Sequence, residues 1–230
     1  MRLIFVRHAE SVANAEGRMQ GHADFPLSDR GRQQAEHLHT GLLNENLSPT
    51  RLFSSPLSRT AETAKIASRS WRLQIMYLDT LKEHDIGVFS GLTWAEAKAE
   101  YPIMAKDLEQ SQDWSKVEGA ESFLEQRQRA RKLVEWLIET HDQHDVLVVF
   151  THGGFLLQII SVVLATEKLW TTPLGNTAVY DFTIDKQQWS NKDSSMFNKA
   201  LWQINRFGDV SHVPMEERIK ARPVDKGERP

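Results

Sequence analysis

Residues 3–11 read Leu3-Ile4-Phe5-Val6-Arg7-His8-Ala9-Glu10-Ser11, and this stretch decides the fold. Four consecutive apolar residues with β propensity, bounded by polar ones, predict a short buried strand. Arg7 and His8 follow at the carboxyl end, where open α/β sheets bind their ligands. An arginine fork matches phosphate oxygens, and histidine is a nitrogen nucleophile that is largely neutral at physiological pH. Together, Arg7 and His8 indicate phosphoryl transfer. The alternative, which an Arg-His pair without further support would favour, is that the two residues only end the strand in solvent.

A second apolar run, from Val146 to Phe150, has the same arrangement. Its continuous hydrophobic character is typical of a central strand covered on both faces. His152 follows it, and Gly153-Gly154 then allow a tight turn into an apolar helix. We expect the two strands to bring His8 and His152 together across one crevice at the edge of the sheet.

Arg59 lies near the start of a predicted helix, because Pro56 favours a helix start and alanines recur beyond it. A helix N-terminus offers unpaired backbone donors and the positive end of the helix dipole. Arg59 and the nearby serines at positions 54, 55 and 58 therefore predict an oxyanion cradle. The alternative is an ion pair between Arg59 and Glu62 on the helix surface.

Length and charge bound the class of protein. The chain has 230 residues, of which 40% are hydrophobic, enough for one sizeable core in a single α/β domain. The formal charge of −3 offers no broad basic field for nucleic acid or an anionic membrane. We therefore expect a small-molecule partner.

Two absences in the sequence add expectations about chemistry and location. The chain contains no cysteine, which excludes disulfides, thiol catalysis and cysteine-ligated metals. It shows no hydrophobic targeting core and no stretch near the ~20 apolar residues of a membrane span. We expect a cytoplasmic protein that does not enter a membrane.

Five ordered motifs resemble the histidine phosphatase superfamily, the phosphoglycerate mutase-like proteins. They are Arg7-His8-Ala9-Glu10-Ser11, Asp24 to Gly31, Ser54 to Ala64, Leu81-Lys82-Glu83 and Thr151-His152-Gly153-Gly154. The resemblance covers roughly residues 1–212. Ala9 departs from it, since glycine is usual there and alone tolerates positive φ freely; we expect Ala9 to modulate the rate and not to abolish the chemistry.

The resemblance implies a single-domain three-layer α/β sandwich, with a mostly parallel sheet and helices on both faces. It assigns residues 1–214 to one histidine phosphatase domain, in which an insert at residues 84–118 lies over the active site. Residues 215–230 are charged and contain proline without an apolar period, which predicts a disordered C-terminal tail.

The resemblance also implies roles for the site residues. His8 is the nucleophile that becomes a phosphohistidine, Glu83 is the proton donor, and His152 is the third catalytic residue. Fixed cationic donors lower the barrier by stabilising the phosphoryl oxygens. The implied phosphate-binding residues are Arg7, Asn14, Arg59 and His152, and among these Arg7, Arg59 and His152 are expected to be the cationic donors. The implied substrate-binding residues are Gln20 and Gly21.

Nothing in the sequence requires a metal or a cofactor. The pair His37 and His39 would point to different faces of a helix. His141 and His144 lie where a long helix is predicted to end, a common place for histidines that complement the helix dipole. We predict that all four are surface residues.

The predicted function is metal-independent hydrolysis of a small phosphomonoester, a phosphorylated metabolite. Family members that act as mutases use a longer insert with an arginine pair, whereas residues 84–126 contain no arginine. The insert at residues 84–118 carries three lysines against seven acidic residues, which disfavours capture of a bisphosphorylated acid. A phosphoglycerate mutase is the alternative, followed by a non-catalytic phosphate-binding scaffold. The oligomeric state is open, a homodimer included.

Overall fold

The computed structural model describes residues 1–169, 174–189 and 197–220. The strands there are β1 (Arg2–Arg7), β2 (Arg51–Ser54), β3 (Ile75–Tyr77), β4 (Val146–Thr151), β5 (Val179–Ile184) and β6 (Leu201–Asp209). The α-helices are α1 (Val12–Ala15), α2 (Asp29–Asn44), α3 (Ser58–Ser68), α4 (Trp94–Glu100), α5 (Pro102–Ser111), α6 (Phe123–Thr140), α7 (Gly153–Val163), α8 (Lys186–Trp189) and α9 (Met215–Lys220). Short 3-10 helices are η1 (Arg69–Trp71), η2 (Asp79–Leu81), η3 (Gly87–Phe89) and η4 (Trp114–Lys116). None of these helices is both long and apolar enough to cross a membrane.

The strands form one sheet in the order β3-β2-β4-β1-β5-β6. The first four strands of that order run parallel to one another, whereas β5 and β6 join by antiparallel pairing. β1 and β4 are direct neighbours, with Arg7 opposite Thr151. The mostly parallel sheet and the adjacency of the two histidine-bearing strand ends are therefore confirmed.

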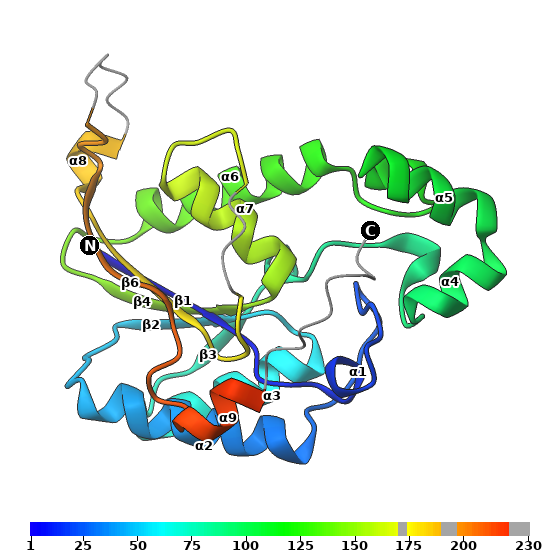
Figure 1. Cartoon of the computed structure of the whole chain (residues 1–230). Coiled ribbons are helices and arrows are strands. Elements are labelled where there is room, and N and C mark those ends of the chain that lie inside the picture. The colour runs from blue at the N-terminus through cyan, green and yellow to red at the C-terminus, as the bar shows by residue number, and fades with distance from the viewer. Residues whose placement is uncertain (170–173, 190–196, 221–230) are drawn as a thin grey trace.

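Helices cover both faces of the sheet and give the predicted three layers (Figure 1). Successive residues of β1 point to opposite faces. Ile4 and Val6 pack in the apolar cluster beneath α2 and α3, while Leu3 and Phe5 pack in the larger cluster beneath α6 and α7. Burial on both faces explains why the β1 and β4 sequences are continuously apolar. The single-domain α/β fold predicted from sequence is confirmed.

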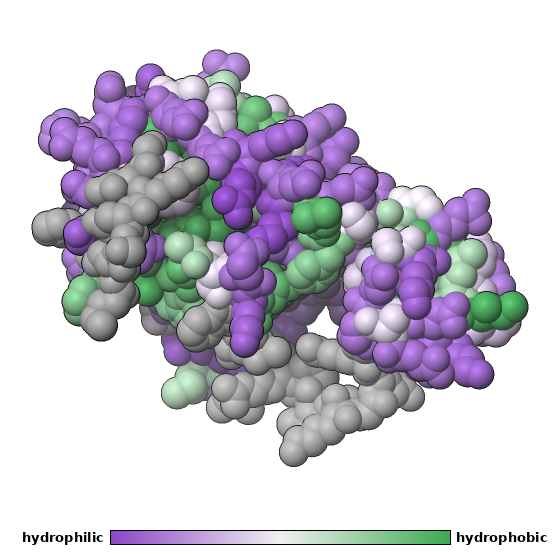
Figure 2. All heavy atoms as spheres, turned by 90° about the horizontal axis from the view of Figure 1, so that it is seen from above, coloured by the Kyte–Doolittle hydropathy of each residue, from purple (hydrophilic) through white to green (hydrophobic). Residues whose placement is uncertain are grey.

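Residues 84–118 form a lobe that contains η3, α4, α5 and η4. Its apolar side chains make a small cluster of their own around Phe89, whose ring packs against that of Trp114 at a centroid distance of 6.3 Å. A backbone hydrogen bond of 2.8 Å from Met19 to Leu92 joins the lobe to the loop after β1. In Figure 2 the lobe lies at the right of the molecule, with hydrophilic and hydrophobic residues mixed on its surface.

Residues 215–220 form α9, where the sequence predicts an irregular tail from position 215. The difference comes from contacts with α2. Arg30 Nη2 donates to the Glu217 carbonyl at 3.0 Å, and His37 Nε2 lies 3.4 Å from Glu217 Oε1. Such tertiary contacts stabilise a helix too short to form alone. Residues 221–230 of the predicted tail lie outside the described residues.

His39 is buried, so its prediction as a surface residue is wrong. Its Nδ1 lies 2.9 Å from the carbonyl oxygen of Ala67, and the Ser70 hydroxyl lies 3.3 Å from its Nε2. The ring therefore joins α2 to the end of α3. Helical periodicity shows which face a residue occupies, but not that a second helix packs over that face.

Candidate active site

The ends of β1 and β4 meet at the carboxyl edge of the sheet. The His8 amide donates to the Thr151 carbonyl at 2.9 Å, which extends the ladder by one residue. The rings of His8 and His152 have centroids 5.1 Å apart, and the two residues are 2% and 0% exposed. The structure thus brings the two predicted catalytic histidines together.

His8 has a defined ring orientation. Its Nδ1 lies 2.6 Å from the backbone oxygen of Ala9. A carbonyl only accepts, so Nδ1 carries the proton and Nε2 keeps its lone pair. Burial, followed by the charges of Arg59 and Arg7, holds the pKa of His8 well below the usual histidine value. His8 is therefore neutral at physiological pH, with Nε2 as a free nucleophile.

His152 lies among hydroxyl groups at the end of β2 and the start of α3. Its Nε2 is 2.8 Å from Ser55 Oγ and 3.2 Å from Thr60 Oγ1. Burial and the positive charge of Arg59 hold its pKa well below the usual value. His152 is therefore neutral in the free site, and its predicted part as a cationic donor to phosphate stays a prediction. A bound phosphate dianion would favour its protonated form.

Arg59 occupies the first turn of α3, as predicted, and is fully buried. Its Nη1 donates to the Ala23 carbonyl at 3.0 Å and its Nη2 to the Gly21 carbonyl at 2.9 Å. Burial lowers its pKa to about 10, so the group stays charged at neutral pH. Its Nε is buried without a hydrogen-bond partner among the described residues. A buried donor left unpaired costs about 1–3 kcal/mol, so this atom suits a bound oxyanion.

The alternative position of Arg59 on the helix surface is wrong. The carboxylate of Glu62 instead accepts a hydrogen bond of 2.7 Å from Nε of Arg32, on α2. The two arginines thus have separate tasks. Arg32 links two helices at the surface, and Arg59 supplies charge inside the site.

Arg7 ends β1 beside the first turn of α7. Its Nη1 donates to the backbone carbonyl of Leu174. A Cβ placed on Gly153 would lie 3.2 Å from Arg7 Nε, tighter than ordinary contact. Glycine at that position therefore lets the guanidinium lie against the start of α7, next to His152.

The loop of residues 20–24 holds Arg59 in place. Asp24 accepts hydrogen bonds of 2.7 Å from both the amide and the hydroxyl of Ser58, which fixes the loop to the start of α3. Gly21 adopts a φ of +49°, which glycine tolerates without a steric penalty. The residue predicted to bind substrate thus turns its carbonyl to Arg59.

Asn14 is linked to the nucleophile through Asn176. The Asn176 side-chain amide donates to the His8 carbonyl at 3.2 Å and to Asn14 Oδ1 at 3.5 Å. Asn14 Oδ1 also accepts from the Ser11 amide, so its NH₂ group remains to donate to a phosphate. Gln20 Oε1 accepts from the Ser11 hydroxyl at 2.8 Å. The structure thus gathers Asn14 and Gln20 around Ser11.

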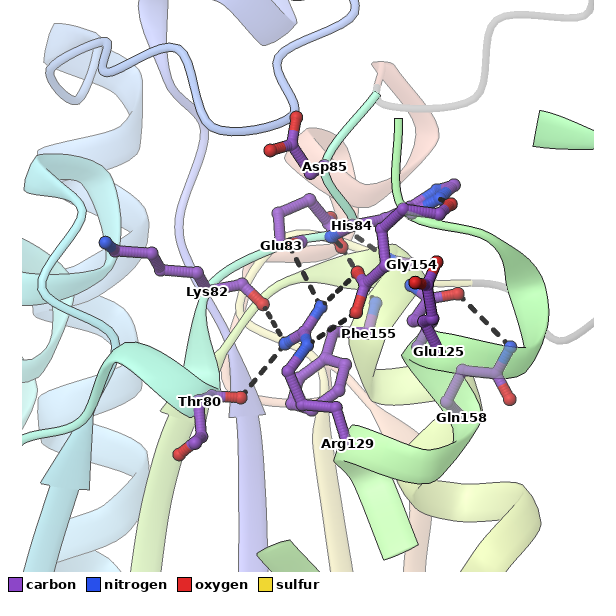
Figure 3. A network of polar contacts seen from close by, with 12 residues as sticks. Thr80, Lys82, Glu83, His84, Asp85, Glu125, Arg129, Gly154, Phe155 and Gln158 are labelled. Atoms are coloured by element: carbon purple, nitrogen blue, oxygen red, sulfur yellow. Dashed lines mark hydrogen bonds and ion pairs between the residues drawn. The ribbon is translucent and has the colours of Figure 1, made fainter. Parts of the chain in front are cut away.

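Glu83 caps the helix that begins after His152 (Figure 3). Its Oε2 accepts from the Gly154 amide at 3.0 Å, and its Oε1 accepts from the Phe155 amide at 2.8 Å. These are orphan amides at the start of α7, and the carboxyl oxygens give them hydrogen-bond partners. The predicted proton donor therefore lies at the same helix terminus as His152.

Two residues with a part in this geometry, Thr60 and Arg129, were missed from the sequence, and Ser55 was predicted for an oxyanion cradle and not for contact with His152. Ser55 and Thr60 contact the ring of His152, and Arg129 donates to the Glu83 carbonyl at 3.2 Å. Ser55 belongs to the motif from which we predicted phosphate binding, and that motif gave no indication of a contact with a histidine. Arg129 lies on the long helix α6. The apolar periodicity of this helix indicates only that it packs on the sheet and does not point to a role for Arg129 in the site.

Ala9 fits its position without strain. Ala9 is buried, and its φ is not positive. Its amide donates to Thr63 Oγ1 at 3.0 Å. The departure from the usual glycine at position 9 therefore needs no conformation that alanine disfavours.

The described residues contain no group of three or more His, Cys, Asp or Glu side chains placed to hold a metal ion. What they do place together is a neutral imidazole nucleophile, two guanidinium groups, a second imidazole and a carboxyl group at a helix terminus. These are the parts that covalent phosphoryl transfer needs.

The chain is similar to known proteins over most of its length. Residues 3–195 match the model of the histidine phosphatase superfamily (branch 1). Phosphoglycerate mutase-like protein 4 of Arabidopsis thaliana is 30% identical over 92% of this chain and 86% of its own length. Metal-independent phosphoserine phosphatase of the same plant is 30% identical over 92% of this chain and 82% of its own length.

A solved structure shows the same fold. The alpha-ribazole phosphatase of Shigella flexneri superposes with a TM-score of 0.73 at 25% identity, covering 81% of this chain and 92% of its own. The sequence match spans both histidine-bearing strands and Glu83. The chain therefore belongs to the histidine phosphatase superfamily, branch 1.

Proposed function

We propose that this protein hydrolyses a small phosphomonoester, without a metal, through a phosphohistidine on Nε2 of His8. The observation that carries the proposal is the ring orientation of His8. Its Nδ1 is committed to the Ala9 carbonyl, which leaves Nε2 as a neutral nucleophile. A relative named as a metal-independent phosphoserine phosphatase supports the same reaction class.

In the first step, Nε2 of His8 attacks phosphorus and the bond to the ester oxygen breaks. Arg7, Arg59 and Asn14 donate to the phosphoryl oxygens, whose charge persists throughout the transfer. The unpaired Nε of Arg59 is one such donor. An alkoxide leaves poorly, so Glu83 in its protonated form gives its proton to the leaving oxygen.

In the second step, water attacks the phosphohistidine. Glu83, now a carboxylate, accepts a proton from that water, and the P–N bond breaks to give inorganic phosphate and neutral His8. His152 donates to the phosphoryl group once the bound anion has favoured its protonated form. The hydroxyls of Ser55 and Thr60 hold its ring in place.

Charge around the insert favours hydrolysis over mutase chemistry. Retention of a bisphosphorylated intermediate needs cations free to bind a second phosphate. Arg18, which faces the insert, is already paired with Glu16 and Glu96 at 2.8 and 2.7 Å. Lys82 is paired with Asp79. Phosphoglycerate mutase remains the second candidate because several relatives carry mutase names.

The expected substrate is a phosphorylated metabolite that fits beside Glu83 and the insert. Relatives named for phosphoserine and for alpha-ribazole phosphate differ widely in the alcohol they release. The shared part is the phosphate group, which the buried side of the site binds. The alcohol therefore has to be identified by assay.

The test measures phosphate release from a panel of alkyl and aryl monoesters in excess EDTA, with a phosphoglycerate mutase assay in parallel. The wild type, His8→Ala and His144→Ala are compared, His144 being exposed and serving as the control. We expect hydrolysis by the wild type and His144→Ala alone. Mutase activity without hydrolysis would establish the second candidate. Silence in both assays, with intact phosphate binding, would indicate a scaffold.

A further inference from the structure

Arg129 uses every N–H of its guanidinium around Glu83. Its Nη1 donates to the carbonyls of Thr80 and Lys82 at 3.0 and 2.8 Å. Its Nη2 donates to the Glu83 carbonyl at 3.2 Å and to Glu121 Oε2 at 2.6 Å, and its Nε donates to Glu121 Oε1 at 2.8 Å. A guanidinium has five donors, and five are used here. Figure 3 shows three backbone carbonyls converging on this one group.

The segment that Arg129 contacts, residues 80–83, does not pair with a strand of the sheet. Glu83 lies between η2 and η3, outside regular secondary structure. The carbonyls of this segment therefore depend on side chains for hydrogen bonds; His22 Nε2 lies 2.9 Å from the Glu83 carbonyl on one side. Arg129 supplies donors to three of these carbonyls from α6, which packs on the central sheet.

Glu121 completes the clamp. Its carboxylate balances the charge of Arg129 by a bidentate contact, the strongest geometry for such a pair. Its backbone amide donates to the Asp85 carbonyl at 2.8 Å, and its carbonyl oxygen lies 2.6 Å from His84 Nε2. The two residues after Glu83 are thus tied to the residue that stands just before α6.

Arg129 also contacts the helix that binds the carboxyl group. Its guanidinium lies 3.8 Å from the centroid of the Phe155 ring. The Phe155 amide is the donor to Glu83 Oε1. One side chain therefore fixes both the backbone of Glu83 and the residue that orients its carboxyl oxygen.

We propose that Arg129, with Glu121, is a positioning residue that sets the place of Glu83 for proton transfer to the leaving group. This inference rests on the role of Glu83 in the proposed function. Lysine cannot replace arginine in it, because an ammonium has three donors and no planar fork. Arg129 contacts the backbone of the Glu83 segment and the ring of Phe155, so in this proposal it acts on departure of the alcohol, not on attack at phosphorus.

The proposal predicts an effect that depends on the leaving group. p-Nitrophenolate leaves without a proton, whereas an alkoxide requires one. Arg129→Gln is expected to lower kcat/KM for an alkyl phosphate by about 10²-fold, the scale of a catalytic group misplaced by ~1 Å. For p-nitrophenyl phosphate the expected loss is only about 3-fold, since proton donation contributes little there. Arg129→Lys should fall between the wild type and Arg129→Gln.

Arg127→Gln is the matched control. Arg127 lies on the same helix and is similarly buried, with side chains 12% and 19% exposed for Arg127 and Arg129. It contacts Ser161, Thr166 and Glu167 and none of residues 80–85. Its replacement loosens α6 and α7 but leaves Glu83 clamped. We expect equal, small changes on both esters, and thermal unfolding of all variants is followed alongside.

A double-mutant cycle with Glu83→Gln separates the outcomes. If Arg129 acts through Glu83, Arg129→Gln adds little to the loss on the alkyl ester once Glu83→Gln is present. Equal losses on both esters, or full additivity with Glu83→Gln, would overturn the proposal while leaving Glu83 as the acid. If Glu83→Gln itself shows no preference between the esters, the proton-donor role fails, and the inference fails with it.

Discussion

The two sides of the site are built in different ways. On the phosphate side, Arg7, His8 and His152 follow buried parallel strands, and Arg59 lies in the first turn of a helix packed on the same sheet. On the leaving-group side, Glu83 lies in an irregular segment held by side-chain contacts to its carbonyls. The residues proposed to act at phosphorus are thus positioned by the central sheet. The side that meets the alcohol is bordered by the insert, whose small core is separate from that of the sheet.

Arg59→Met tests the phosphate side. Its expected effect on activity is larger than that of Gly21→Ala. Removal of one preorganised donor costs on the order of 10²- to 10³-fold in rate. We expect the same loss of kcat/KM for aryl and alkyl esters, because the phosphoryl oxygens are common to both. Steady-state kinetics on the two esters measures it. Arg32→Met, which removes only the exposed ion pairs with Asp29 and Glu62, should stay within about 2-fold of the wild type. A loss confined to alkyl esters would contradict the division between the two sides.

Gly21→Ala tests the loop where the two sides meet. A Cβ there would lie 2.5 Å from Ile86 Cγ1 and 2.8 Å from Ser90 Oγ of the insert, while the Gly21 carbonyl holds Arg59. We expect about a 10-fold loss of kcat/KM on both esters as Arg59 shifts. The clash adds a loss of about 1–3 kcal/mol in the free energy of unfolding.

Gly17→Ala is the control for backbone strain. Gly17 has a φ of +69° and nothing within 4 Å of the added Cβ. Both variants share a cost of roughly 1–2 kcal/mol for alanine in the left-handed region. Urea unfolding compares their stabilities. Equal stability and equal activity in the two variants would show that contact with the insert does not fix the loop.

The buried histidines make the stability of the folded protein depend on pH. Burial lowers the pKa of His8 and His152 well below 6.5 in the folded protein. Below pH 6.5 the unfolded chain takes up protons that the folded chain does not, so stability is full above pH 6.5 and falls as the pH drops. The slope is at most about 1.4 kcal/mol per pH unit for each histidine.

Urea unfolding at a series of pH values from 7.5 to 5 measures this slope. His8→Asn and His152→Asn should each show a shallower loss of stability than the wild type, whereas His144→Asn, at an exposed position, should not. A slope unchanged in both buried-site variants would mean that the site histidines take up protons as readily as exposed ones.

The phosphate side could be predicted from sequence because its determinants are local. An apolar run predicts a strand, the polar residues after it lie at its carboxyl end, and Pro56 with the alanines after it places Arg59 in a first turn. What the pattern could not show is the environment of each group. Closure of the loop of residues 20–24 over Arg59, and the burial that leaves His152 neutral, depend on contacts between distant segments.

The leaving-group side was predictable only in part. Glu83 was found through the family resemblance, but its partners on α6 and α7 are 46 to 72 residues away in the chain. Arg129 gave no signal because a polar residue on an amphipathic helix ordinarily faces solvent. The prediction that His39 lies at the surface failed for a related reason. The periodicity of α2 does not show that α3 packs over this residue.

The most direct test of the central claim is to look for the covalent intermediate. A rapid mix of the wild type with ³²P-labelled monoester in EDTA, quenched in alkali and digested, separates labelled peptides. The account predicts label on the peptide that contains His8, stable to base and labile to acid, and no label in His8→Ala. Turnover in EDTA with no labelled histidine, or label retained in His8→Ala, would contradict it.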